Sequence, residues 1–113
     1  IVSDAQPCYA LPEIKAVGLA GYFDPVIISA IYGFRKPDPR LFQKALDLMD
    51  LTTAEVIYVG NDRYHDIYGA GRMGIKTIFI GSEQEAKNWE HVTADYVAAQ
   101  FGDVFEGVEA LAL

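Results

Sequence analysis

An apolar run that ends in glycine and passes directly into acidic residues constrains this chain more than any other feature. Residues 56–60 read Val-Ile-Tyr-Val-Gly, and Asn61, Asp62 and then Asp66 follow. The run is typical of a buried strand, and the helical pattern that begins near Ile67 predicts a strand–loop–helix unit. Open α/β sheets bind ligands at the carboxyl ends of their strands. The pattern therefore delivers carboxylates to the edge of a sheet where chemistry takes place.

The rest of the chain alternates short apolar strands with helical patterns. The predicted strands cover residues 1–3, 26–29, 56–60, 76–80 and 96–98. The predicted helices cover a stretch that ends near residue 17, then residues 38–49, 64–73, 82–88 and 103–112. This alternation predicts an α/β fold of the three-layer, Rossmann-like type, with a mainly parallel sheet between two layers of helices. A length of 113 residues fits one domain.

Local signals mark two of these elements most clearly. Asp38 is a good N-cap and Pro39 a good first residue for the helix that runs to residue 49. Thr52 and Glu55 have the spacing of a capping box, which predicts a short helical turn before strand 56–60. The helical spacing places four residues on one apolar face of helix 38–49, with Phe42 and Leu46 beside them: Leu41, Ala45, Leu48 and Met49.

Composition excludes several classes of function. The net charge is −7 and no block of Lys and Arg interrupts it, so we expect no nucleic-acid partner. No apolar run approaches the roughly 18–20 residues that span a bilayer, so we expect no membrane-spanning segment. The single cysteine, Cys8, excludes a disulfide within the chain and fits a reducing compartment, so we expect a cytoplasmic protein.

Three loops follow predicted strand ends and would open on one edge of a parallel sheet. The first holds Ser3 and Asp4, the second spans residues 29–36 and the third spans residues 61–66. The hydroxyl of Ser3 and the backbone N–H groups after it, including that of Asp4, are good donors to a phosphate oxygen. Lys36 supplies a compact positive charge that pairs with phosphate. These residues predict a phosphate-binding site, although Ser3 in a turn and Lys36 at the surface are the competing interpretations.

Asp62 and Asp66 predict a divalent-cation site beside that phosphate. Carboxylates four positions apart can face one point if the second lies in the first turn of a helix. Hard oxygen ligands suit Mg²⁺, which stabilises charge on a transferring phosphoryl group. A helix-capping role for Asp66 is the alternative. His65 is interpreted as a structural residue, and the nearby tyrosines, among them Tyr58 and Tyr68, as packing residues.

Three segments in order resemble the second, third and fourth motifs of the haloacid-dehalogenase-like (HAD) hydrolase superfamily. They are residues 1–3, residues 35–39 and residues 59–77. The resemblance implies an Mg²⁺-dependent phosphatase that acts on a small phosphorylated metabolite through an aspartyl-phosphate. It implies that Ser3 and Lys36 act as catalytic residues on the phosphoryl group.

The resemblance also implies the metal ligands. Asp62 and Asp66 would serve the Mg²⁺, one of them directly and the other directly or through water. Asn61 stands where the family often has aspartate, and it would contribute its carbonyl oxygen or a hydrogen bond.

The first motif of the superfamily, Asp-x-Asp-x-Thr, does not occur in residues 1–113. The resemblance therefore implies that residues 1–113 are the C-terminal part of one HAD-like core domain, with no second domain or cap among them. The sheet would lack its central N-terminal strand, and a missing N-terminal segment of the same protein would supply the nucleophilic aspartate. The alternative is a non-catalytic HAD-fold binding or interaction module, which Asn61 and the absent nucleophile favour.

Overall fold

The computed structural model describes residues 1–4, 27–28, 33–82 and 92–112. The helices expected to end near residue 17 and to cover residues 82–88 fall almost wholly outside the described residues. The chain divides into two compact units, Ile1–Leu51 and Thr52–Leu113.

The first unit combines a pair of short parallel strands with one helix. Strand β1 (Val2–Ser3) pairs with β2 (Ile27–Ile28). Helix α3 (Pro39–Met49) begins where the sequence predicts, since the side chain of Asp38 accepts a hydrogen bond from the backbone N–H of Arg40 at 2.9 Å. The predicted N-cap and first helical residue are therefore confirmed.

The buried face of α3 is shorter than the sequence predicts, because it does not extend into the last turn of the helix. Its buried residues are Leu41, Phe42, Ala45 and Leu46. Leu48 and Met49, which were expected on the same face, are 51% and 38% exposed, so that part of the prediction is wrong. The partly buried side chains of Val2 and Phe34 pack against Leu41 and Ala45, in the first two turns of the helix. The last turn lies beyond this contact.

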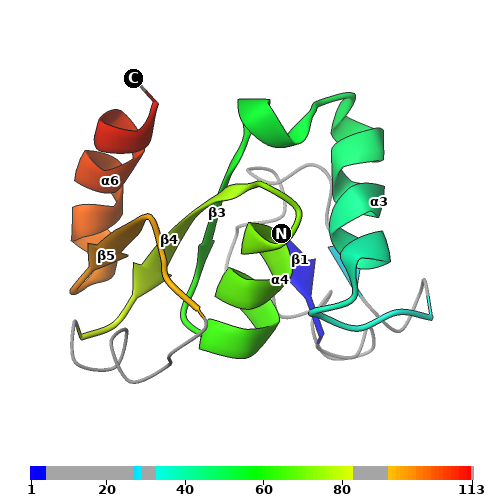
Figure 1. The fold of residues 1–113 in the computed structure, drawn as a ribbon, viewed down its shortest axis with the longest axis horizontal. Coiled ribbons are helices and arrows are strands. Elements are labelled where there is room, and N and C mark those ends of the chain that lie inside the picture. Colours follow the sequence, from blue (N-terminus) through cyan, green and yellow to red (C-terminus); the bar gives the residue numbers. More distant parts are fainter. Residues whose placement is uncertain (5–26, 29–32, 83–91, 113) are drawn as a thin grey trace, which may run out of the picture. The chain divides into compact units, whose positions relative to one another are not determined.

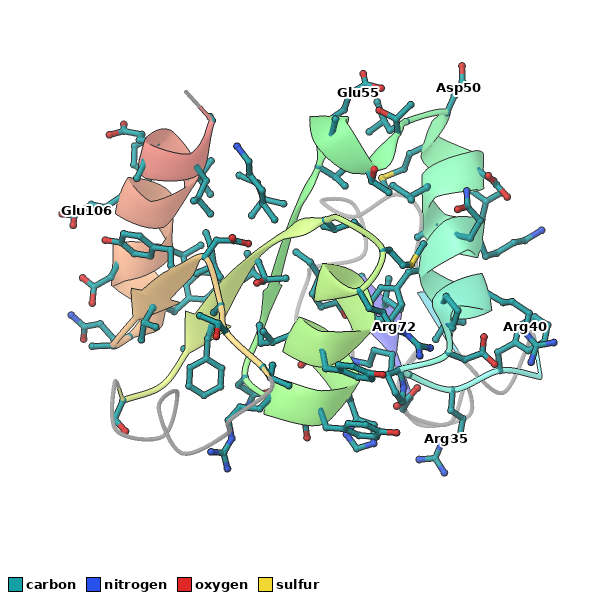
Figure 2. All side chains as sticks on the ribbon, in the orientation of Figure 1. Arg35, Arg40, Asp50, Glu55, Arg72 and Glu106 are labelled. Atoms are coloured by element: carbon teal, nitrogen blue, oxygen red, sulfur yellow. The ribbon has the colours of Figure 1, made fainter. Side chains whose placement is uncertain are left out.

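Contacts of Arg40 link residues in the turn that leads into α3. The guanidinium of Arg40 lies 4.0 Å from the ring centroid of Phe34, and its Nη2 lies 2.7 Å from Oδ2 of Asp38. Arg40 projects from the N-terminal end of the helix (Figure 2). Arg40 thus contacts one residue two positions before Lys36 and one residue two positions after it.

The second unit contains a three-stranded parallel sheet in the order β3–β4–β5 (Figure 1). Its strands are β3 (Ile57–Gly60), β4 (Lys76–Ile80) and β5 (Tyr96–Ala98), as the sequence predicts. Strand β4 lies in the middle, and its residues 77–79 are buried. Among the described residues, no strand pairs with members of both sheets.

Short helical segments precede and follow strand β3. A 3-10 turn, η2 (Thr53–Glu55), precedes β3, and Glu55 Oε1 accepts the backbone N–H of Thr52 at 3.0 Å, as the capping-box spacing predicts. Between β3 and β4 the chain forms a π-helical turn, η3 (Arg63–Tyr68), which continues into α4 (Gly69–Gly71). The sequence predicted an ordinary α-helix over residues 64–73, so the type of the first turn is a correction.

The last helical segment of the described chain packs on strands β4 and β5. A 3-10 turn, η4 (Phe101–Asp103), leads into α6 (Val104–Leu111), which lies beside β4 and β5 (Figure 1). Glu106 on α6 points away from the sheet (Figure 2). The Nζ of Lys76 donates to the carbonyl oxygen of Leu111 at 2.7 Å, which ties the end of α6 to the start of β4. None of the described helices is long and apolar enough to cross a membrane.

Candidate functional site

The turn at the carboxyl end of β3 is wider than an α-helical turn. The carbonyl oxygen of Asp62 accepts the backbone N–H of Asp66 at 3.0 Å and that of Ile67 at 3.1 Å. The second of these bonds spans five residues, as in a π-helix, and such turns are frequent at functional sites. The wide turn places Asp66 in the first turn after the strand, as the two-carboxylate hypothesis requires.

The carboxylate of Asp66 lies back against the strand end. Asp66 as a whole residue is only 5% exposed to solvent. Oδ2 accepts the backbone N–H of Asp62 at 3.2 Å, and Oδ1 accepts the hydroxyl of Tyr58 at 3.3 Å. A buried carboxylate needs hydrogen-bond partners to offset lost hydration, and here each oxygen has one. The capping role considered for Asp66 is thus a hydrogen bond that its carboxylate accepts from the backbone N–H of Asp62.

Gly60 makes this arrangement sterically possible. A Cβ added at Gly60 would lie 2.5 Å from Cβ, Cγ and Oδ2 of Asp66, closer than real Cβ atoms approach. The observed position of the Asp66 side chain therefore requires a glycine at position 60.

Asp62 is held through one of its two carboxylate oxygens. Oδ1 accepts the backbone N–H groups of Tyr64 and His65 at 3.0 and 2.7 Å, and it lies 3.0 Å from Nδ1 of His65. Burial acts to raise the pKa of Asp62, but the hydrogen bonds from His65 and Tyr64 and the charge of His65 outweigh it and lower the pKa below its ordinary value. Within the described residues all of these bonds end on Oδ1.

These donors match the coordination preferences of Mg²⁺. Mg²⁺ takes one or two protein carboxylates and completes its shell with water and substrate oxygens. Asp62 and Asp66 supply two carboxylates within one turn, and Asn61 is exposed beside them. No group of three or more His, Cys, Asp or Glu side chains in the described part of the chain is placed to hold a metal by itself. The set suits a cation that shares its shell with a ligand, and the metal-ligand assignment stays a prediction.

The predicted phosphate-binding residues come together in the first unit. Oδ1 of Asp4 accepts the backbone N–H of Lys36 at 3.0 Å, across 32 positions of the sequence. Ser3 is the last residue of β1 and pairs in register with Ile28. The structure thus brings the loop after β1 to the turn before α3, although the roles of Ser3, Asp4 and Lys36 toward phosphate stay predictions.

Two contacts were missed by the sequence analysis. Tyr58, interpreted as a packing residue, donates its hydroxyl to Asp66, and His65, interpreted as structural, contacts Asp62. A signal for Tyr58 existed, since it precedes Gly60 by two positions and residues at that spacing share one face of a strand.

Comparison with known proteins assigns the family. The sequence profile described as "Haloacid dehalogenase-like hydrolase" matches residues 1–80. The chain belongs to the haloacid dehalogenase-like hydrolase family. The resemblance on which the motif assignment was based is therefore confirmed.

Two curated phosphatases are similar to the chain in sequence. It is 34% identical over 111 residues to a glyceraldehyde 3-phosphate phosphatase from Pyrococcus furiosus, covering 96% of the chain and 46% of that protein. It is 31% identical over 80 residues to a phosphoserine phosphatase from Thermus thermophilus, covering 71% of the chain and 32% of the relative.

A solved HAD structure gives the same fold. A conserved haloacid dehalogenase-like protein of unknown function from Agrobacterium tumefaciens matches with a TM-score of 0.85 at 22% identity, covering 100% of the chain and 54% of that structure. The expected Rossmann-like, HAD-like α/β fold is confirmed. The chain spans about half or less of the length of all three of these proteins.

Proposed function

We propose that these 113 residues are the C-terminal part of the core domain of an Mg²⁺-dependent HAD phosphatase whose substrate is a small phosphorylated metabolite. The family assignment and the phosphatases among its relatives support this reaction class. The observation that carries the proposal is the turn after β3, where the absence of a Cβ at Gly60 lets the buried carboxylate of Asp66 lie against the strand end and accept the backbone N–H of Asp62. In this proposal both units belong to one domain.

In this proposal, the predicted site residues of each unit have different roles toward the phosphoryl group. Ser3, through its hydroxyl, and the backbone after it, including Asp4, bind phosphoryl oxygens. Lys36 adds a positive charge that offsets the charge of the transition state. Asp62 and Asp66, with the carbonyl oxygen of Asn61, would hold Mg²⁺, which when bound supplies charge neutralisation at the phosphoryl oxygens.

The nucleophile belongs to polypeptide outside residues 1–113 in this proposal. An aspartate of an Asp-x-Asp-x-Thr motif attacks phosphorus in line, the bond to the leaving oxygen breaks, and water then hydrolyses the aspartyl-phosphate. The residues of this chain contribute positioning and electrostatic stabilisation, which carry most of the catalysis of phosphoryl transfer.

Phosphate release from the complete gene product tests the proposal. The assay uses p-nitrophenyl phosphate and a panel of small phosphorylated metabolites that includes glyceraldehyde 3-phosphate and phosphoserine. We expect Mg²⁺-dependent activity that EDTA removes and that Asp66→Asn lowers by about 10–100-fold, since a polar isostere cannot replace the charge toward the cation. Asp47→Asn, an exposed substitution on α3, is the matched control and should leave activity unchanged.

The opposite outcome supports the alternative function. If the complete protein is folded, lacks an Asp-x-Asp-x-Thr segment and releases no phosphate with Mg²⁺, the phosphatase proposal fails. The non-catalytic binding module, which Asn61 favours, then remains. Activity that is insensitive to both EDTA and Asp66→Asn would refute the metal role alone.

A further inference from the structure

The side chain of Tyr58 lies on the face of β3 that also carries Gly60. Residues two apart on a strand point to the same face, and the helical turn η3 brings Asp66 onto that face at Gly60. Because Gly60 has no Cβ, the carboxylate of Asp66 sinks to the strand. There the hydroxyl of Tyr58 lies 3.3 Å from Oδ1.

The two oxygens of Asp66 are held from opposite parts of the turn. Tyr58 donates to Oδ1 from within the strand, and the backbone N–H of Asp62 donates to Oδ2 from the start of η3. One anchor on each oxygen fixes the plane of the carboxylate as well as its position. Phenylalanine at position 58 would fill the same space as the tyrosine ring. Tyr58 additionally directs its hydroxyl at the buried carboxylate of Asp66.

We infer that Tyr58 is a positioning residue that orients the Asp66 carboxylate toward a divalent cation. The inference rests on the proposed function, because it gives Asp66 the role of a metal ligand. Partners that hydrogen-bond a ligating carboxylate typically change metal affinity or activity by about 10–100-fold when they are removed. The 3.3 Å contact is long for a hydroxyl donor, so we expect an effect at the lower end of this range.

Tyr58→Phe in the complete protein removes the hydroxyl and keeps the ring. The measurement is a titration with Mn²⁺ followed by its electron paramagnetic resonance signal, together with the Mg²⁺ concentration that gives half-maximal activity. We expect Tyr58→Phe to weaken cation binding about 10-fold in both titrations, with an unchanged KM for the phosphorylated substrate. Tyr68→Phe is the matched control, because Tyr68 is half-buried and stacks on Tyr64 with ring centroids 5.5 Å apart. This control should leave cation binding unchanged.

The outcomes separate the inference from the proposed function. If the wild-type protein binds no Mn²⁺, the proposed function fails and the inference fails with it. If the wild type binds Mn²⁺ and Tyr58→Phe binds it equally well, only the inference is overturned. Melting temperatures in EDTA provide the remaining test. If Tyr58→Phe melts far below Tyr68→Phe without cation, the hydroxyl supports the fold rather than the ligand, and the inference is again overturned.

Discussion

The contacts that hold the predicted site residues of the two units span very different lengths of chain. In the first unit, Asp4 and Lys36 meet across 32 positions through a side-chain-to-backbone hydrogen bond. In the second unit, Tyr58, Gly60 and Asp66 meet within 8 positions. A contact across a long loop has to overcome the entropy of closing that loop, whereas a turn is closed by its own backbone. The second site is therefore a property of one local segment, and the first depends on the fold of its whole unit.

The largest expected effect comes from filling the local turn. Gly60→Ala places a Cβ 2.5 Å from the Asp66 side chain, so the turn must shift or expel the carboxylate. We expect a loss of about 1–3 kcal/mol in the free energy of unfolding, measured by urea denaturation. Gly71→Ala is the control, since apart from its chain neighbours and its own helix backbone no atom lies within 4 Å of its added Cβ, and it should be neutral or stabilising by up to about 1 kcal/mol. Equal effects of the two substitutions would show that the turn is not tightly built.

An intermediate effect is expected from breaking the long-range contact. Asp4→Ala removes the acceptor for the backbone N–H of Lys36, and we expect a loss of about 1 kcal/mol in the same denaturation experiment. Asp4→Asn keeps an oxygen acceptor and should recover most of that loss. If Asp4→Ala destabilises no more than Asp4→Asn, the contact is unimportant and the two sites differ less than their geometry suggests.

The smallest effect concerns the pH dependence of stability. The pKa of Asp62 is lower in the folded chain than its ordinary value of about 3.9, so its charged form stabilises the fold at neutral pH. This contribution is lost as the pH falls below about 4 and through the folded pKa, because the unfolded chain binds the proton first. Between pH 6 and pH 3, the urea midpoint of the wild type should fall further than that of Asp62→Asn. A parallel decline of both proteins would exclude this contribution.

Local signals explain what could be read from the sequence. Asp38 and Pro39 act on the turn that contains them, and α3 begins where they predict. The apolar run before Gly60 likewise marks β3, and the acidic residues after it mark the turn. These features depend on neighbours in the chain, so a single sequence contains the information.

Other features depend on partners that the sequence does not reveal locally. The same residues fit an α- or a π-helical turn after β3, and the observed turn is the one in which Asp66 reaches the backbone N–H of Asp62. Leu48 fits the helical pattern of α3, but its exposure is decided by where Val2 and Phe34 make contact. No pattern links Asp4 to Lys36, because their meeting depends on the intervening fold.

The close approach of α6 to the sheet ties two distant positions together. A Cβ at Gly107 would lie 2.6 Å from Cδ1 of Tyr96 and 3.0 Å from Cδ1 of Ile78. Position 107 can therefore acquire a methyl group only if the ring at position 96 moves aside or is exchanged for something slimmer. Substitutions at these two places are consequently not independent, because a methyl group at position 107 needs either a displaced or a smaller side chain at position 96.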